Sequence, residues 1–331
     1  MPALPAVPDG LTVRHLADDA AAVAELLTAA EPHDDTGENF AAQDITEWWT
    51  GWHIDPATDG LGVFDGDGRL AGYATALIEP TWRDAVGIYL EGRVRPELRG
   101  RGVGRALLGW QLARGRELHA ERLPEAPARL VVPVSEGVAG LEGLVRRAGL
   151  EPERWYRQME RPLTGLPRPA SVPGVEIVPF DPARDDEVRR THNACFTEHH
   201  GSSERDAETW AALFTGQRSF RPDLSVIGVR DGAVVGYVLA YVYDADSEAN
   251  GYRQTHLGQI GVLPAARGIG LAKALIAEAL RVAADDGCER AGLDVDSDNV
   301  TGALRLYESL GFTTARTQVS WSERLAPVAA R

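Results

Sequence analysis

Apolar positions follow the same order of patterns twice along the chain. Helix-like segments are predicted at 18–30 and at 184–195, each followed later by a continuous apolar run of strand length, at 70–78 and at 234–242. An Asp-Gly turn stands before each apolar run. Because such turns accept the positive φ that tight hairpins need, both regions predict antiparallel hairpins. The chain therefore predicts two mixed domains of about 150 residues each.

The strand after each hairpin ends at a loop of arginine and glycine. Residues 96–108 read Pro-Glu-Leu-Arg-Gly-Arg-Gly-Val-Gly-Arg-Ala-Leu-Leu, and residues 264–276 read Pro-Ala-Ala-Arg-Gly-Ile-Gly-Leu-Ala-Lys-Ala-Leu-Ile. Aligned without a gap, they share Pro, Arg, two Gly, Ala and Leu. Helices are predicted to run from these loops to about His119 and Asp286. The repeat extends over a whole domain, since Gly72-Tyr73 matches Gly236-Tyr237, which indicates duplication followed by divergence.

Proline marks the predicted boundary between the two copies. Residues 162–174 contain four prolines and form a stiff linker. We expect a disordered tail over 1–10, a first domain over 11–161 and a second domain over 175–325. In the second domain, Ser203 to Asp206 suits a capping box for the helix that carries Trp210.

Composition restricts the classes of function. The formal net charge of −15 disfavours nucleic acid and favours a cationic small molecule. No apolar run is long enough to span a bilayer, and the first residues lack the regions of a secretion signal, so we expect a cytoplasmic protein without membrane contact. Two cysteines, Cys195 and Cys288, indicate reduced thiols rather than a disulfide framework. Either a monomer or a homodimer is compatible with the sequence.

The two loops predict phosphate binding, because a glycine-rich helix start presents unpaired amides and a partial positive charge to an anion. A P-loop requires Gly-Lys-Ser or Gly-Lys-Thr, which neither loop has. A dinucleotide fingerprint requires different glycine spacing than residues 100–104 show, and a parallel strand where this chain has a hairpin. Both of these interpretations fit poorly.

A third interpretation accounts for the whole pattern. Arg-Gly-x-Gly-x-Gly/Ala between a strand and a helix, then an Asn-containing strand end, then Tyr-x-x-x-Gly-Phe, resembles the GCN5-related N-acetyltransferases over nearly all of the chain, twice. The resemblance implies an α/β (α+β) fold with two tandem domains, each a mixed, mainly antiparallel sheet flanked by helices. It implies acetyl-CoA as cofactor and no metal. The residues that it assigns to coenzyme A in the second half are Ile260, Gly261, Val262, Arg267, Gly268, Ile269, Gly270, Leu271, Ala272, Lys273 and Asn299, and in the first half Gly92, Arg93, Val94, Arg99, Gly100, Arg101, Gly102, Val103, Gly104 and Arg105.

The resemblance also assigns the acyl-transfer chemistry. Tyr307 matches the family tyrosine near the thioester sulfur, where it would protonate the departing thiolate; the alternative is a core tyrosine. His256 is the candidate general base, because an imidazole with its ordinary pKa of about 6.5 accepts protons near neutral pH; the alternative is a strand-edge histidine facing solvent.

Further polar residues are candidates for the acceptor. Gln259 is placed to orient a water, and Glu91 holds the matching position in the first half as either a residual base or a strand-face carboxylate. His199 and His200 lie where the family has its substrate lid and lack a third metal ligand nearby. The acidic residues at 244–248 line either a cation-accepting mouth or a solvated loop.

The two halves are unequal. Counting back from Gly149, Val145 stands at the place of Tyr307 and Gly137 at that of Asn299, so we expect a degenerate first domain and catalysis in the second. The favoured function is acetylation of a primary amine on a small, cationic molecule. The tandem arrangement also resembles mycothiol synthases, which implies a cysteinyl aminosugar as acceptor, although those enzymes have a glutamate in place of His256. Protein lysine acetylation and a non-catalytic acyl-CoA sensor remain alternatives.

Overall fold

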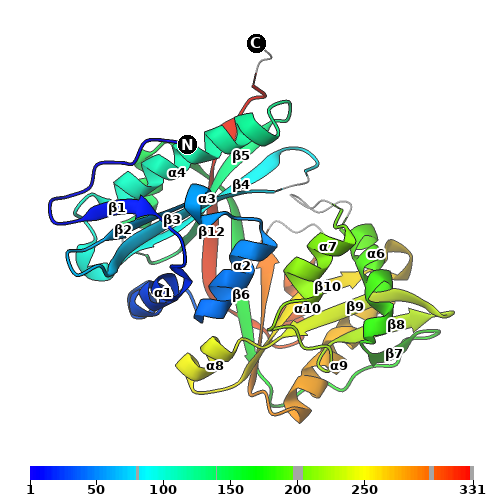
Figure 1. Cartoon of the computed structure of the whole chain (residues 1–331). Helices are drawn as coiled ribbons and strands as arrows, with labels where there is room; N and C mark the ends of the chain where they lie inside the picture. Colours follow the sequence, from blue (N-terminus) through cyan, green and yellow to red (C-terminus); the bar gives the residue numbers. More distant parts are fainter. Residues whose placement is uncertain (80–81, 139, 197–203, 298–301, 329–331) are drawn as a thin grey trace. The chain divides into compact units, whose positions relative to one another are not determined.

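The computed structural model describes the chain except residues 80–81, 139, 197–203, 298–301 and 329–331 (Figure 1). It divides into two compact units. Unit 1 comprises Met1–Trp155 and Gln318–Arg331, and unit 2 comprises Tyr156–Thr317. Among the helices of the described ranges, none combines the length and apolar content that a membrane crossing requires.

Unit 1 is built on a sheet with strand order β1-β2-β3-β4-β5-β12. Its neighbours pair antiparallel except β4 and β5, which are parallel. The elements are β1 Thr12–His15, α1 Ala20–Asp34, α2 Ala42–Gly51, α3 Pro56–Asp59, β2 Gly60–Phe64, β3 Leu70–Ile78, β4 Val86–Val94, α4 Val103–Arg122, β5 Ala128–Ser135, α5 Leu141–Arg147 and the start of β6 Glu151–Pro162.

Unit 2 repeats this plan with strand order β6-β11-β10-β9-β8-β7, in which only β10 and β11 pair in parallel. The predicted α/β (α+β) fold, a mixed and mainly antiparallel sheet flanked by helices, is therefore confirmed. The elements are β7 Glu176–Pro179, α6 Asp185–Cys195, α7 Ala207–Trp210, β8 Val226–Arg230, β9 Ala233–Tyr241, α8 Asp244–Asn250, β10 Gln254–Val262, α9 Leu271–Asp285, β11 Arg290–Asp296, α10 Ala303–Ser309 and β12 Thr313–Leu325.

Two long strands divide differently from the predicted boundaries. Residues 156–162 of β6 pair with β11 in unit 2, although the first domain was predicted to extend to residue 161. Residues 318–325 of β12 pair with β5 in unit 1, although they follow the second repeat in the sequence. The apolar pattern of a closing strand gives its burial but not its partner, because either sheet offers an open edge.

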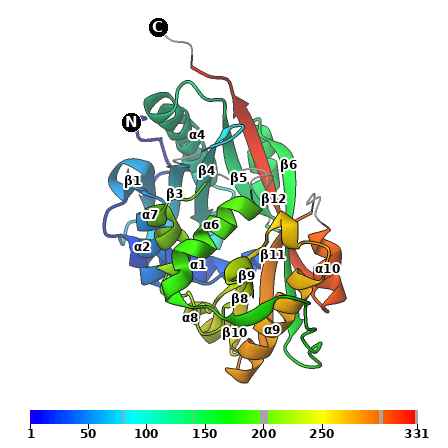
Figure 2. The ribbon, with the colours of Figure 1, turned by 90° about the vertical axis from the view of Figure 1, so that its right-hand side faces the viewer.

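Strand β9 shows how the sheet of unit 2 is buried on both faces. Tyr237 and Tyr241 point to the face covered by α6 and α7, where they pack with Trp210. Val238 and Ala240 alternate with them and point to the opposite face, where α9 and α10 supply the apolar side chains. Figure 2 shows α6 and α10 on opposite sides of β11. This double burial explains the continuous apolar run in the sequence.

Two local predictions in unit 2 are wrong. The helix that carries Trp210 begins with Asp206 as its N-cap, whose carboxylate accepts the Thr209 amide at 2.8 Å, so the predicted capping box at Ser203 does not set its start. Residues 244–250 form the helix α8 instead of a loop. Acidic residues at its first and third positions favour this helix start electrostatically.

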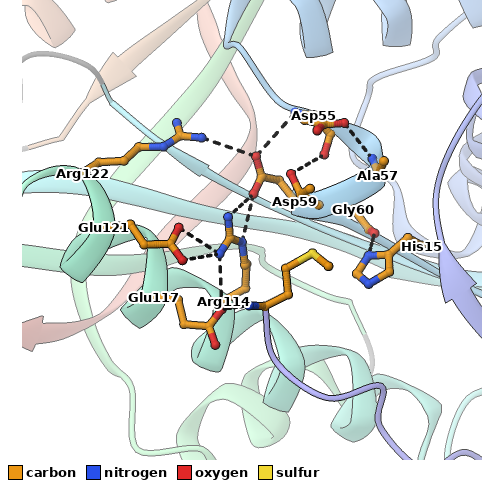
Figure 3. Close-up of polar contacts among 11 residues, drawn as sticks. His15, Asp55, Ala57, Asp59, Gly60, Arg114, Glu117, Glu121 and Arg122 are labelled. Atoms are coloured by element: carbon orange, nitrogen blue, oxygen red, sulfur yellow. Dashed lines mark hydrogen bonds and ion pairs between the residues drawn. The ribbon is translucent and has the colours of Figure 1, made fainter.

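A buried ion pair connects two elements of unit 1 (Figure 3). Asp59, at the end of α3, is 2% exposed and accepts from the guanidinium of Arg114 at 2.9–3.0 Å. Arg114 also contacts Glu117 and Glu121 on its own helix α4. Removing one partner of a buried pair leaves the other charge without compensation, which costs far more than loss of a surface pair.

We therefore predict that Asp59→Ala lowers the free energy of unfolding by about 3 kcal/mol, because Arg114 stays buried without its principal partner. Urea denaturation measures the effect. The matched control is Glu121→Ala, whose half-exposed carboxylate contacts the same guanidinium and should cost less than about 1 kcal/mol. Equal effects of the two substitutions would contradict the assignment of Asp59 as the principal partner.

Candidate functional site

The central feature of unit 2 is the point where two parallel strands separate. β10 and β11 pair only over Gln254–His256 and Arg290–Gly292. Beyond it, β10 remains paired with β9 as far as Val262, and β11 remains paired with β6 as far as Asp296. The facing edges of β10 and β11 therefore have no ladder between them in their second halves, within the described residues.

Some backbone N–H and C=O groups of β10 point into this gap. The Leu263 amide donates to Val235 on the β9 side at 2.9 Å. Backbone groups alternate along an antiparallel strand, so those of Val262 and Ile260 point to the β11 side. A ligand in the gap can therefore pair with β10 as a further strand would. Gly261, between them, points its backbone to β9.

Two glycines of β10 lie under tyrosine rings from β9. A Cβ at Gly261 would lie 2.5–2.8 Å from the ring and hydroxyl of Tyr237, and a Cβ at Gly258 would lie 2.7 and 2.9 Å from ring atoms of Tyr241. The register between β10 and β9 shifts at Gly258, which marks a bulge. Only glycine permits these close approaches, so the predicted importance of Gly261 has a steric basis.

The loop after β10 leads into a helix start that favours an anion. Gly268 and Gly270 have φ of +79° and +83°, and α9 begins directly after Gly270 without a side-chain cap. Its first turn contains no acidic residue and places the exposed Lys273 third. A cation is unfavourable beside the positive end of a helix dipole unless an anion binds there. The remaining predicted loop residues are Ile269, which is exposed, Leu271, which is buried, and Ala272, which is half-buried.

Arg267 reaches from this loop to two carbonyl groups. Its Nε donates to the Val262 carbonyl at 3.1 Å, and its Nη2 donates to the Cys195 carbonyl at 3.3 Å. The side chain is exposed, and within the described residues no carboxylate forms an ion pair with it. Its positive charge is therefore available to a phosphate.

The loop of unit 1 has the same backbone conformation as that of unit 2, but its arginine has a carboxylate partner. Gly100 and Gly102 have φ of +76° and +98°, and α4 also begins with no acid and a basic third residue, Arg105. Arg99 repeats the contact to the end of its strand but also binds both oxygens of buried Asp34, at 2.6 and 2.9 Å. Its charge is largely compensated. Arg93, which was also predicted to bind coenzyme A, lies 3.5 Å from Asp34. The remaining predicted residues of unit 1 lie at the end of β4, in the loop and at the start of α4: Gly92, Val94, Arg101, Val103 and Gly104.

Tyr307 lies in α10 with its side chain almost wholly buried. Burial raises the pKa of its phenol to about 12, so the hydroxyl stays protonated at neutral pH. It packs with the α9 face of the sheet and meets Phe312 edge-on. Val145 occupies the matching position in α5 of unit 1 and is fully buried. Asn299 lies outside the described residues.

His256 is the last residue of β10 that pairs with β11, so it stands at the beginning of the gap. Its Nε2 lies 3.5 Å from the carboxylate of Asp294 on β11, and the ring of Tyr243 meets it edge-on. Gln259 follows on the same strand after the bulge and is half-buried. The lid candidates His199 and His200 lie outside the described residues.

The sequence pattern did not single out Asp294 or Asp34. Asp294 lies between the buried Leu293 and Val295 of β11, and a carboxylate between two apolar residues is the signal that could have identified it. Asp34 ends a helix that was expected to finish earlier, and only the fold brings it to Arg99. In the described part of the chain, no group of three or more His, Cys, Asp or Glu side chains is arranged to hold a metal ion.

Comparison with known proteins identifies the family. The model of the GNAT acetyltransferase family matches residues 20–130 and 186–312, more than half of the chain. The chain belongs to this family, and it is an N-acetyltransferase with two tandem domains of this kind.

The chain is similar to individual members of this family in sequence and in structure. The chain is 32% identical over 288 residues to the mycothiol acetyltransferase of Streptomyces coelicolor, covering 80% of this chain and 81% of the relative. It is 33% identical over 238 residues to that of Frankia alni, covering 70% and 69%. Two solved structures share the fold: a GCN5-related N-acetyltransferase from Sphaerobacter thermophilus (TM-score 0.78, 24% identity, 98% and 99% covered) and a tandem GNAT protein from the clavulanic acid biosynthesis pathway (0.64, 18%, 97% and 99%).

Glu91 in β4 is expected to make the free energy of unfolding of unit 1 depend on pH. Burial raises its pKa to about 6 from an ordinary value of 4.5, opposed by nearby Arg93. The native state therefore loses stability as pH rises from 4.5 through 6. We predict that Glu91→Gln raises the free energy of unfolding by about 2 kcal/mol at pH 8 and leaves it unchanged at pH 4.

Urea denaturation at the two pH values measures this difference. The control is Glu142→Gln, an exposed carboxylate on α5 that should change the free energy of unfolding by less than about 0.5 kcal/mol at either pH. A gain for Glu91→Gln that is the same at pH 4 and pH 8 would refute the assignment of a half-buried carboxyl with a raised pKa.

Proposed function

We propose that unit 2 transfers the acetyl group of acetyl-CoA to the primary amine of a small molecule. The observation that carries this proposal is the gap between β10 and β11 directly beside an acid-free helix start. The gap supplies free backbone groups of a strand, and the helix start supplies amides and positive charge. An extended pantetheine arm joined to a pyrophosphate requires this pair of features.

The residues present fit the cofactor. Ile260 and Val262 would pair with the pantetheine arm through their backbone groups, and residues 267–273 would hold the pyrophosphate. The uncompensated charge of Arg267 favours unit 2 over unit 1, where Asp34 binds the matching Arg99. Bound acetyl-CoA would supply a thioester whose acetyl group the acceptor amine attacks.

Tyr307 would act as the general acid. A phenol whose pKa is raised to about 12 remains protonated and can donate to a developing thiolate. Unit 1 has no such group at this position, because Val145 replaces it. We therefore place catalysis in unit 2.

His256 would act as the general base. It stands where β10 and β11 separate, and it accepts a proton from the acceptor ammonium so that the free amine can attack. The nearby Asp294 carboxylate stabilises the protonated imidazole that results. The net charge of −15 also favours a cationic acceptor.

The similarity to mycothiol acetyltransferases supports a cysteinyl aminosugar as the first acceptor to test. A panel of other small amines belongs beside it, because the net charge of −15 favours cationic acceptors in general. The panel comprises amino acids, aminosugars, polyamines and cysteamine. Chromatographic quantitation of the N-acetyl product avoids interference from thiol-containing acceptors.

We predict that at least one of these acceptors is acetylated and that Tyr307→Phe lowers kcat about 100-fold, because the ring stays in place while the proton donor is removed. The melting temperature should remain close to that of the wild type. Full turnover by Tyr307→Phe would exclude the proposed general acid. Binding of acetyl-CoA without turnover of any acceptor would instead favour the acyl-CoA sensor.

A further inference from the structure

One buried hydroxyl in unit 2 lacks a hydrogen-bond partner. The side chain of Tyr241, on β9, is 3% exposed, and its Oη finds no donor or acceptor among the described residues. Buried polar groups are nearly always paired, so a hydroxyl without a partner among the described residues is a hydrogen-bonding group that a ligand can use. Neighbouring Tyr237 has a buried hydroxyl too, but His192 lies 2.7 Å from it and satisfies it.

The position of Tyr241 relates this hydroxyl to the proposed acceptor site. Its ring covers the bulge of β10 at Gly258, and the Cδ2 atom of His256 lies 3.5 Å from where a Cβ of that glycine would be. Tyr243 stacks on Tyr241 and meets His256 edge-on. The ring of Tyr241 and the candidate base His256 therefore lie next to Gly258, and the ring of Tyr243 contacts both of them.

Unit 1 provides an internal comparison. Counting from Gly72 and Gly236, the position of Tyr241 is occupied by Leu77, which is buried in an apolar cluster. Unit 1 thus has apolar side chains at the positions of both Tyr307 and Tyr241. The hydroxyl of Tyr241 is present in the unit that retains the proposed acid and absent from the other.

We propose that Tyr241 is a specificity-determining residue whose hydroxyl donates a hydrogen bond to an oxygen of the acceptor, close to the amine that His256 deprotonates. The acceptor class is a small primary amine that carries a carbonyl or hydroxyl oxygen near its amine. The inference rests on the proposed function of unit 2. Burial raises the pKa of the Tyr241 phenol well above 10, so the hydroxyl acts as a donor.

Tyr241→Phe tests the inference, because it removes the hydroxyl and keeps the ring over Gly258. The probes are the cysteinyl aminosugar and cysteamine, which keeps an amine and a thiol but lacks every oxygen. We expect kcat/KM for the cysteinyl aminosugar to fall about 10-fold, kcat/KM for cysteamine to change less than about 2-fold, and KM for acetyl-CoA to stay the same.

A stability readout separates this role from a structural one. Tyr241→Phe breaks no hydrogen bond among the residues that the structure describes and should leave the melting temperature equal or higher. Tyr237→Phe loses its bond to His192 and should lower the melting temperature. Unchanged kcat/KM of Tyr241→Phe for the cysteinyl aminosugar, or an equal loss for both probes, overturns this inference and leaves the proposed function unaffected. Failure of the wild type to acetylate the cysteinyl aminosugar overturns this inference, whereas only failure with every acceptor of the panel overturns the proposed function as well.

Discussion

The end of parallel pairing between β10 and β11 is the constraint on which the account of unit 2 depends. A parallel ladder satisfies the backbone of both strands, so its end after His256 and Gly292 leaves one edge of β10 without a strand partner, and there the Val262 carbonyl accepts from Arg267. β9 and β6 keep the two strands in place on their outer sides. The gap is therefore rigidly bounded, and its unpaired backbone is a property of the fold rather than of any one side chain.

The same backbone arrangement occurs in unit 1, and the two units differ in the charges and hydroxyls placed around it. Asp34 compensates Arg99, whereas Arg267 reaches only carbonyl groups in the described part of the chain. Val145 and Leu77 stand where unit 2 has Tyr307 and Tyr241. The two units therefore share the geometry that backbone and glycine determine and differ in the side chains around it.

Much of the fold could be predicted from local pattern, because hairpins, loop glycines and helix starts are specified by neighbouring residues. The bounds of β3 agree with the predicted run at 70–78 for this reason. The partners of β6 and β12 could not be predicted, since strand burial does not identify the neighbouring strand. The loop residues and Tyr307 follow from motif spacing, but Asp294, Asp34 and the orphaned hydroxyl of Tyr241 depend on contacts between residues far apart in the sequence.

Hydrogen–deuterium exchange with and without coenzyme A tests the central claim that the gap of unit 2 binds the acyl donor. The account predicts that amides of residues 268–273, together with Ile260 and Val262, exchange at least about tenfold more slowly when coenzyme A is bound, because they hydrogen-bond to it. Unchanged exchange of these amides at saturating coenzyme A would contradict the account.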